Sequence, residues 1–279
     1  MKRDCFFFCR NEVGLMKYVV VTGAYGGMGE KTVQLLKAQG YEIFALDKKV
    51  KEKEEHIYPL EVDVTKEESV QNAFMEIQKI TKEITAIIHF AGIYMLNSLV
   101  EMSSEDFKKI MDINLYGVYL MNKTFLPLLV KESKIVITTS ELAVVKPLPF
   151  TGIYAISKTA LDCYAYSLKM ELQLLGIHVS VIRAGAIQTD MLGASTRALD
   201  QFCEQTKLYS CNAEKFHQIV DKVEAKCVSP EQIAKLVHKI LKKKKPKFAY
   251  SINRNFLLKL FHILPMKMQF WAIRKVLKK

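Results

Sequence analysis

Short apolar runs alternate with amphipathic stretches along most of this chain. The runs are rich in Val, Ile and Ala, and each has the length of a buried β-strand. The stretches between them place apolar residues three and four positions apart, which predicts helices. We expect strands at 17–22, 41–46, 56–64, 86–90, 134–139, 178–182 and 248–252. We expect helices at 30–39 and 66–82, two helical segments within 103–130, a long helix at 154–175 and another from Ser229.

Residues at the ends of these segments support the helices. Gly176 follows the long helix and is typical of a C-cap. Ser229 and Pro230 are the residue types preferred at an N-cap and at the first helical position. Strands that alternate with helices predict one α/β domain over residues 17–252, with a parallel sheet covered on both faces. Between about 185 and 228 the pattern weakens, and we expect a loop-rich insert there.

Charge divides the chain into two parts. Residues 1–231 carry 27 basic and 29 acidic side chains, whereas residues 232–279 carry 14 basic side chains and no acidic one. The net charge of +12 therefore resides in the C-terminal part. The six cysteines form no C-x-x-C pair, so we expect no bound metal and the reduced thiols of a cytoplasmic protein.

A glycine-rich segment follows the first predicted strand and reads Thr22-Gly23-Ala24-Tyr25-Gly26-Gly27-Met28-Gly29. Glycines at these positions permit a tight turn and a close approach of the backbone to a pyrophosphate, which the next helix would face with its N-terminal N–H groups. The segment is not a P-loop, because no Gly-Lys-Ser/Thr follows. Taken alone, it fits either a dinucleotide site or an ordinary glycine-rich turn.

Asp47 ends the second predicted strand, 18 residues after Gly29. A carboxylate at this position accepts hydrogen bonds from both ribose hydroxyls of an adenosine and repels a 2′-phosphate, which favours NAD over NADP. Lys48 and Lys49 follow directly and are able to bind such a phosphate. NADP therefore stays open as the alternative.

A second group of polar residues lies in the middle of the chain. Tyr154 and Lys158 are four residues apart and share one helix face. We expect the Lys158 ammonium to lower the pKa of the phenol, so that Tyr154 exchanges a proton near neutral pH. Ser140 ends the fifth predicted strand, where its hydroxyl is able to bind a substrate oxygen, and Thr139 is the alternative for that role.

In this order, the motifs resemble those of the single-domain short-chain dehydrogenase/reductase family. The resemblance covers residues 17–252 and also includes Asp63-Val64, Ala91-Gly92, Asn114 and R-A-G-A-I-Q-T at 183–189. It implies a Rossmann-like α/β fold, a doubly wound parallel sheet of about seven strands with helices on both faces. To this fold the sequence adds a basic amphipathic C-terminal helical tail, residues 253–279.

The resemblance also implies roles for individual residues. Tyr154 would be the catalytic acid/base, and Lys158 would tune its pKa and bind the nicotinamide ribose. Ser140 would orient and polarise the substrate carbonyl, while Asn114 would hold the water of a proton relay. Contacts with the cofactor are implied for Gly23, Tyr25, Gly27, Met28 and Gly29 at the pyrophosphate, Asp47 at the ribose, Asp63 and Val64 at the adenine, Ala91 and Gly92 beside the adenine ribose, and Gly185, Ile187 and Thr189 at the nicotinamide end.

The sequence departs from the family pattern in four places. His89 and Phe90 stand where the family usually has two asparagines, and we interpret His89 as structural. Ala184-Gly185 replaces Pro-Gly, which predicts a looser nicotinamide loop. Ser140 lies 14 residues before Tyr154, one more than the commonest spacing. Glu141 follows Ser140 in place of a small or apolar residue, and we expect it to face the substrate mouth.

These observations predict an oxidoreductase that uses NAD(P)(H) to interconvert a secondary alcohol and a ketone, or an alcohol and an aldehyde. The alternative is a catalytically silent dinucleotide-binding regulator or a membrane-surface adaptor. The resemblance implies a homodimer or homotetramer. Residues 189–228 would cover the substrate with side chains that suit a steroid, retinoid or other lipid, or that simply pack the lid: Met191, Leu192, Leu199, Phe202, Leu208, Tyr209 and Phe216.

The tail predicts two amphipathic helices separated at Pro265. The first stripe comprises Phe256, Leu257, Leu260, Phe261 and Leu264, and the second comprises Phe270, Ile273 and Leu277 with Trp271 beside it. The tail either lies on an anionic membrane or packs on a subunit interface or a pocket. Apolar stripes argue against nucleic-acid binding. No apolar run has the length needed to cross a bilayer, so we expect a cytoplasmic protein, attached peripherally to a membrane in the first case.

The first residues, Met1 to Met16, have too short an apolar run for a secretory signal. We interpret them as a disordered leader. Met16 directly precedes the first strand and is the alternative start of translation.

Overall fold

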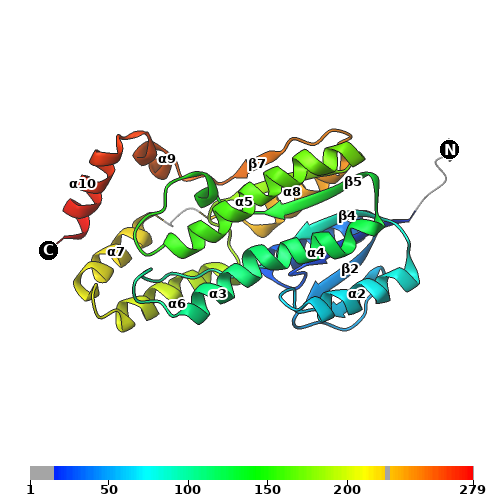
Figure 1. Cartoon of the computed structure of the whole chain (residues 1–279), viewed down its shortest axis with the longest axis horizontal. Coiled ribbons are helices and arrows are strands. Elements are labelled where there is room, and N and C mark those ends of the chain that lie inside the picture. Colours follow the sequence, from blue (N-terminus) through cyan, green and yellow to red (C-terminus); the bar gives the residue numbers. More distant parts are fainter. Residues whose placement is uncertain (1–15, 224–226, 279) are drawn as a thin grey trace, which may run out of the picture.

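Seven parallel β-strands form one sheet in the part of the chain that this computed structural model describes, residues 16–223 and 227–278. Their order is β3-β2-β1-β4-β5-β6-β7, so the chain begins in the middle of the sheet and winds outward in both directions (Figure 1). The strand order reverses between β1 and β4, which opens a crevice at the carboxyl ends of the strands. The strands are β1 (Lys17–Thr22), β2 (Tyr41–Asp47), β3 (Ile57–Glu61), β4 (Ile84–His89), β5 (Leu129–Thr138), β6 (His178–Ala184) and β7 (Ala249–Ile252).

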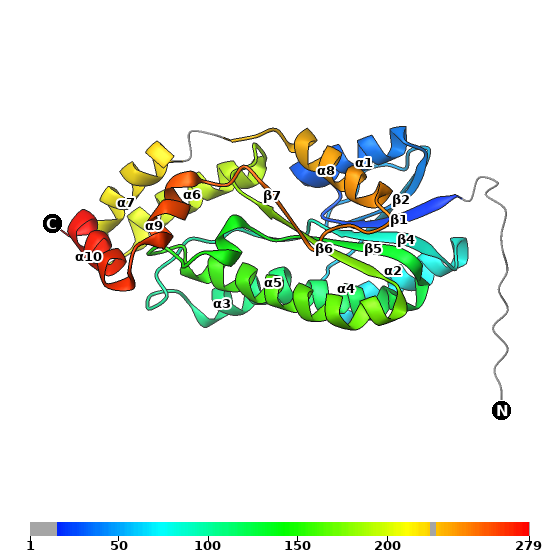
Figure 2. The same ribbon diagram turned by 90° about the horizontal axis from the view of Figure 1, so that it is seen from above.

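Helices cover both faces of this sheet, and Figure 2 shows the two layers from the side. α1 (Gly27–Ala38) and α8 (Pro230–Lys242) pack together on one face. α2 (Glu67–Ile80), α4 (Gly117–Phe125) and α5 (Gly152–Leu172) cover the other. The central strands β1 and β4 are buried on both sides, as continuous apolar runs require. The predicted doubly wound α/β fold is confirmed.

The two helical segments predicted within 103–130 are joined by a π turn. α3 (Ser104–Met111) begins at Ser103, whose hydroxyl accepts a hydrogen bond from the Asp106 N–H at 3.0 Å. The π turn spans Asp112–Tyr116 and leads into α4, which a short 3₁₀ turn (Leu126–Leu128) ends. Asn114 lies in the π turn and is fully buried. Such turns are frequent at functional sites, because the extra residue re-aims the side chains around it.

Two strand boundaries differ from the prediction by three residues or more. β5 begins at Leu129, five residues before the expected position, because Leu129 pairs with Ile84 before the register shifts. Glu132 adopts a φ of 69° within this irregular part, and its polar neighbours hid the strand. β3 ends at Glu61 instead of Val64, because the chain turns at Asp63, whose carboxylate accepts a hydrogen bond from the Thr65 N–H.

The insert after β6 is helical, so the prediction of a loop-rich segment is wrong. It contains α6 (Asp190–Gln205) and α7 (Ser210–Val223). Residues that disfavour helices, among them Gly193, hid α6 in the sequence. The two helices enclose a small core of their own around Phe202 and Phe216. Residues 224–226 of the insert and residues 1–15 of the predicted leader lie outside the described residues.

The tail forms two helices, and the break between them lies at Pro265, as predicted. α9 (Phe256–Ile263) and α10 (Met266–Leu277) lie at the end of the molecule that also carries α6 and α7 (Figures 1 and 2). Leu277 is buried in the core of the insert, and its carbonyl accepts a hydrogen bond of 2.6 Å from the Asn212 side chain. One side of α10 therefore packs on α7.

Candidate active site

The glycine-rich loop between β1 and α1 has no room for side chains. Gly23 has a φ of 65°, and a methyl group built on it would lie 2.6 Å from the Ala91 nitrogen. A methyl group on Gly29 would lie 2.0 Å from the Gly23 carbonyl oxygen, and one on Gly27 would lie 2.7 Å from the Thr189 side chain. The loop thus lies directly against the segments after β4 and β6. This is the cradle that a pyrophosphate requires.

Tyr25 and Met28 contribute to the cradle through their backbones. The Tyr25 N–H donates a hydrogen bond of 3.0 Å to Asp47 Oδ2, which ties the loop to the end of β2. The Tyr25 hydroxyl is buried and has no hydrogen-bond partner among the described residues. Met28 packs against the core beneath α1. The Asp47 carboxylate, which this bond ties to the loop, lies at the crevice.

Asp63 and Val64, for which the resemblance implies contacts with the adenine, follow β3. Asp63 Oδ1 accepts hydrogen bonds from the N–H and the hydroxyl of Thr65 at 3.0 and 2.7 Å. Its other oxygen lies 3.0 Å from Lys48 Nζ. Despite burial, these bonds and this ammonium hold the pKa of Asp63 below its usual range. Lys48 is therefore engaged by Asp63, and Val64 is buried against Gly117.

Tyr154 and Ser140 meet at the carboxyl edge of the sheet. Tyr154 lies in the first turn of α5 and is almost fully buried, and the Ser140 side chain lies close enough to act on the pKa of its phenol. Ser140 follows β5, and its hydroxyl accepts a hydrogen bond of 3.1 Å from the Leu142 N–H. Thr139 points elsewhere and bonds to Asp162 Oδ1 at 3.2 Å. The geometry selects Ser140 over Thr139 as the partner of the phenol.

Lys158 and Asn114 converge on Gly92. A methyl group on Gly92 would lie 3.2 Å from Asn114 Oδ1 and 3.5 Å from Lys158 Nζ. Lys158 Nζ donates a hydrogen bond of 3.2 Å to the Thr138 carbonyl and lies 5.8 Å from the centre of the Tyr154 ring. The Asn114 amide bonds to both backbone groups of Ile93, at 2.8 and 3.0 Å. It thereby holds the segment after β4 in place beside α5.

The electrostatics of this site differ from the prediction for the phenol. Burial raises the pKa of Tyr154 well above its usual value of 10.0, and the neighbouring Tyr94 adds to the increase. The Ser140 side chain opposes it. Burial also lowers the pKa of Lys158 to about 8. The predicted lowering of the tyrosine pKa by the lysine is wrong for the protein's own groups, because desolvation outweighs the attraction of an ammonium on the far side of the ring.

Comparisons with known proteins agree with this geometry. The family model described as short chain dehydrogenase matches residues 17–200, more than half of the chain. The chain belongs to the short-chain dehydrogenase family.

Two curated relatives and one solved structure represent the similar proteins. The chain is 31% identical over 192 residues to an NADPH-dependent 1-acyldihydroxyacetone phosphate reductase of Schizosaccharomyces pombe, a match that covers 65% of this chain and 65% of that protein. It is 27% identical to a 3-ketodihydrosphingosine reductase of Bacteroides thetaiotaomicron, over 84% of this chain and 87% of that one. A short-chain dehydrogenase family protein from Francisella tularensis has the same fold, with a TM-score of 0.72 and 22% identity, over 85% of this chain and 97% of that one.

The segment after β6 of this family member is held at several points. Gly185 N–H donates to the Ile252 carbonyl at 2.9 Å, and a methyl group on Gly185 would lie 1.9 Å from the Asn253 carbonyl oxygen. Ile187 is buried and pairs with Val228. The segment has no proline before Gly185, but it is not loose as predicted. Contacts with β7 and with the end of the insert hold it in place. Thr189, at the start of α6, lies against the glycine loop.

Two further departures from the family pattern have structural explanations. His89 is buried, its Nε2 lies 2.9 Å from Asn122 Oδ1, and burial lowers its pKa to about 4. The neutral ring joins β4 to α4, which agrees with a structural role. Glu141 Oε2 accepts a hydrogen bond of 2.6 Å from the Asn255 N–H, so it links the Ser140 segment to the start of α9. Its Oε1 lies 3.1 Å from the position of a methyl group on Gly185, so the carboxylate also borders the segment after β6.

Sequence reasoning assigned no role to three residues around the site. Arg183 of β6 and Asp162 of α5 form a paired ion bridge, with N···O distances of 3.0 and 2.7 Å, which fixes α5 against the sheet. Asp162 lies four residues after Lys158 and therefore shares its helix face. That spacing could have indicated from the sequence that Asp162 lies near the site. The Phe150 ring lies tilted against the Phe202 ring, with ring centres 4.5 Å apart. The backbone of Phe150 has a φ of 66°, which is strained for a bulky residue. Nothing in the sequence pattern marked it.

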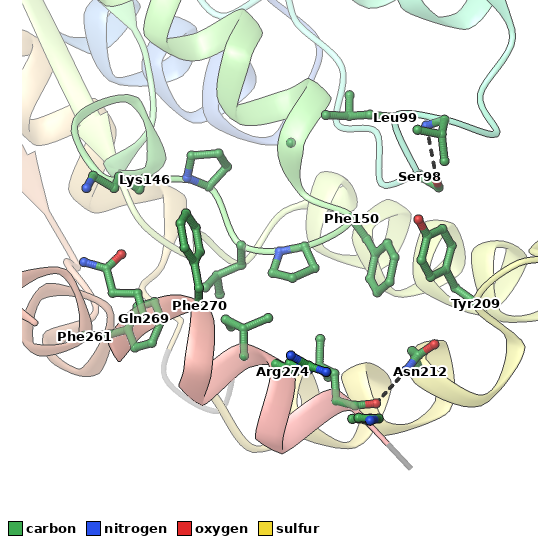
Figure 3. A pocket seen from close by; sticks show the side chains of 18 residues that line it. Ser98, Leu99, Lys146, Phe150, Tyr209, Asn212, Phe261, Gln269, Phe270 and Arg274 are labelled. Carbon is green, nitrogen blue, oxygen red and sulfur yellow. Dashed lines mark hydrogen bonds between the residues drawn. The ribbon is translucent and has the colours of Figure 1, made fainter. Parts of the chain in front are cut away.

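A pocket of about 650 Å³ lies between the loop 146–152, α7 and the two C-terminal helices (Figure 3). Its lining is mostly apolar and includes three basic residues, Lys146, Arg274 and Lys278, but no acidic one. Its inner wall reaches Gly152, two residues before Tyr154. Of the predicted lid residues, Tyr209 lines the pocket, Leu199, Phe202 and Phe216 are buried in the lid core, and Leu208 is exposed, while the side chains of Met191 and Leu192 lie outside the described part.

Proposed function

We propose that this short-chain dehydrogenase uses NAD(H) to interconvert a ketone and a secondary alcohol on a long-chain lipid. The observation that carries the proposal is the convergence of Tyr154, Ser140 and Lys158 beside the glycine cradle. A phenol and a neighbouring hydroxyl suit the two needs of a carbonyl oxygen, a hydrogen bond and a proton. The buried Lys158 ammonium lies beside Gly92, in the segment that packs against the glycine loop, and would bind the nicotinamide ribose there.

The protein's own groups then divide the work. A bound nicotinamide supplies or accepts the hydride at the substrate carbon. In the reductive direction, the Tyr154 hydroxyl donates its proton to the carbonyl oxygen, which the Ser140 hydroxyl orients by a hydrogen bond. In the oxidative direction, the phenol first passes its own proton toward solvent, and its oxygen then takes the proton of the alcohol. Lys158 and the Asn114 turn complete the path along which the proton reaches solvent.

The charges around the ribose site support NAD over NADP. Asp47 presents a carboxylate at the end of β2, where it repels a 2′-phosphate. Lys48, the nearest lysine, lies 3.0 Å from the Asp63 carboxylate, and Lys51 is paired with Glu30 at 2.5 Å. The yeast relative uses NADPH by its name, so a direct comparison of NADH with NADPH decides this point.

The pocket supports a substrate with an apolar chain and an anionic or polar head. Aromatic and aliphatic side chains dominate its wall, and its basic residues have no acidic neighbour in the lining. Both relatives described above act, by their names, on ketones that carry a long chain. We therefore place the reacting ketone at Tyr154 and the chain of the substrate along the pocket.

The decisive experiment measures NADH and NADPH oxidation with a panel of long-chain keto lipids, for the full chain and for Tyr154→Phe. We expect the variant to lose activity by about 10²–10⁴-fold, the contribution of a general acid, and to bind NADH as the wild type does. Tyr166→Phe, an exposed tyrosine on the same helix, is the matched control and keeps full activity. A Tyr154→Phe enzyme that turns over normally refutes the mechanism, and a wild type that binds NADH without any turnover indicates a silent regulator.

We also propose a homodimer or homotetramer that packs through α4 and α5. The outer sides of these helices expose Tyr119, Tyr166 and Met170, which a second copy of the same helices would cover. Light scattering of the purified protein gives the mass that tests this assembly.

A further inference from the structure

The C-terminal helices carry a concentrated apolar surface that the protein does not cover. We call it the apolar ridge, and about half or more of each of its side chains is exposed. Phe256 and Ile263 on α9 are 72% and 71% exposed, and Phe270 and Trp271 on α10 are 68% and 60% exposed. Single exposed apolar residues are ordinary, but a cluster of this density marks an interaction surface. The ridge consists of Phe256, Leu260, Ile263, Met266, Met268, Phe270 and Trp271.

Met268 and Trp271 of the ridge lie on the side of α10 that remains after this helix has packed, and Phe270 lies at the edge of the packed side, beside the pocket. Gln269, Ile273 and Leu277 recur every four residues along α10 and face the protein. Gln269 is buried and donates a hydrogen bond of 2.7 Å to the Leu264 carbonyl, which fixes the turn between the helices. Trp271 lies on the opposite side of the α10 cylinder from Ile273. The side chains of the ridge therefore remain exposed in the described structure.

Charge identifies the partner of the ridge. Lys267, Arg274 and Lys275 are exposed around it, and the sequence has no acidic residue after Glu231. Lys275 Nζ lies 5.0 Å above the Trp271 ring. Tryptophan beside exposed lysine is the pattern that rests at the headgroup level of a bilayer, with the ring in the acyl boundary and the ammonium at the lipid phosphates.

A second copy of this chain fits the ridge poorly. A two-fold contact between two ridges would place basic residues of one copy against those of the other, which is unfavourable. In the described chain, no helix is both long enough and apolar enough to cross a membrane. We infer that α9 and α10 lie on the surface of an anionic bilayer, with the apolar ridge inserted at the boundary between headgroups and acyl chains.

The position of the pocket gives this docking a purpose. Phe270 of the ridge and the neighbouring Arg274 line the pocket on one side. Leu99 and Val100, which are 52% and 71% exposed, line the pocket on the other side. Docking therefore brings the mouth of the pocket to the bilayer, where a lipid is able to enter without crossing water. This consequence rests on the proposed function, whereas the docking itself does not.

Trp271 provides a direct measurement, since it is the only tryptophan of the chain. We expect its emission to shift to shorter wavelength when the full-length protein meets vesicles of phosphatidylcholine and phosphatidylglycerol in equal parts. Lipids brominated on the acyl chain will quench it. Vesicles of phosphatidylcholine alone will bind the protein much more weakly. Emission that stays unchanged with the anionic vesicles overturns the proposal.

Paired variants separate the ridge from general stickiness and from general positive charge. Phe256→Gln with Ile263→Gln will abolish co-sedimentation with anionic vesicles, whereas Leu174→Gln with Leu175→Gln, equally exposed at the far end of α5, will not. Lys267→Gln with Lys275→Gln will weaken vesicle binding by about fivefold per lysine removed. The matched pair Lys244→Gln with Lys245→Gln, before β7 at the amino end of the sheet, will have little effect.

Two outcomes contradict the docking surface. Equal sedimentation of the ridge and control variants refutes it, provided that circular dichroism shows all of them folded. A ridge variant that changes the mass in solution, in a protein that binds no vesicles, assigns the ridge to a second copy. Activity then tests the consequence separately: the ridge variants will lose activity toward a keto lipid presented in vesicles and keep it toward a short water-soluble ketone. If neither substrate reacts with the wild type, the proposed function fails and the vesicle result still stands.

Discussion

Replacing Lys158 with methionine should make the protein more stable while it destroys the proposed activity. Lys158 is 6% exposed, and its ammonium donates a hydrogen bond to the Thr138 carbonyl, with no carboxylate partner among the described residues. Burial therefore holds its pKa at about 8, below the ordinary value of 10.5. A buried ammonium without a counter-charge disfavours the folded state, and a methionine of similar length removes that penalty.

The magnitude follows from the pKa of Lys158. The difference between 10.5 and about 8 corresponds to about 3 kcal/mol of destabilisation at pH 7. Loss of the hydrogen bond to Thr138 returns about 1 kcal/mol. We expect Lys158→Met to raise the free energy of unfolding by about 2 kcal/mol, and the melting temperature by about 5 °C.

The predicted gain in stability also depends on pH, in a direction that the pKa of Lys158 determines. The folded protein holds the Lys158 proton less tightly than the unfolded chain, so wild-type stability increases as the pH rises from about 8 toward 10.5. The advantage of Lys158→Met is therefore complete below pH 8 and declines above it, to near zero at a pH of about 9.5.

Urea unfolding at neutral pH and at the higher pH, with protein freed of nucleotide, measures both values. Lys123→Met, an exposed lysine on α4, serves as the control and should change stability by less than about 0.5 kcal/mol. A Lys158→Met protein that is less stable than the wild type at pH 7, or whose advantage is independent of pH, would refute the reasoning.

Three further predictions concern other parts of the site. Asp47→Ser should shift the preference toward NADPH by about 10–100-fold in kcat/KM, because it removes charged hydrogen bonds to the ribose and a repulsive carboxylate; an unchanged ratio of the two cofactors would contradict the assignment. Gly185→Ala should reduce NADH affinity and lower the melting temperature, because its methyl group would lie 1.9 Å from the Asn253 carbonyl oxygen; titration and calorimetry measure both. His89 is neutral in the fold down to a pH of about 4, so stability should be lost as the pH falls from about 6.5 to below 4, by about 3 kcal/mol in total, and acid unfolding of His89→Asn should lack this component.

The fold could be predicted largely because its signals are local. Each strand of the parallel sheet is a continuous apolar run, and Gly176, Ser229 and Pro265 mark where helices end or begin. The order of the strands could not be obtained in this way, since it depends on pairings between distant segments. The early start of β5 was hidden because polar residues, Lys131 to Ser133, separate Leu129 from the apolar run, and Leu129 pairs with Ile84 before an irregular register.

The residues of the site likewise divide into those that local sequence predicts and those that depend on the three-dimensional structure. The positions of Gly23, Asp47 and Ser140 follow from their place directly after a strand, because the carboxyl ends of parallel strands meet at one edge. The side chain of Asn114 depends on a π turn, which interrupts the helical period and therefore leaves no trace in it. The pKa of Tyr154 was predicted with the wrong sign, because a sequence shows which charges are near but not how much water is excluded.

The chain concentrates its chemistry on one rigid rod. Tyr154, Lys158 and Asp162 recur at intervals of one helical turn on α5, and Arg183 fastens that rod to the sheet. Movement of α6 and α7 leaves the mutual spacing of these groups intact. Natural variation in the insert can therefore exchange one substrate for another without retuning proton transfer, and a designer could graft a different cover onto the same scaffold.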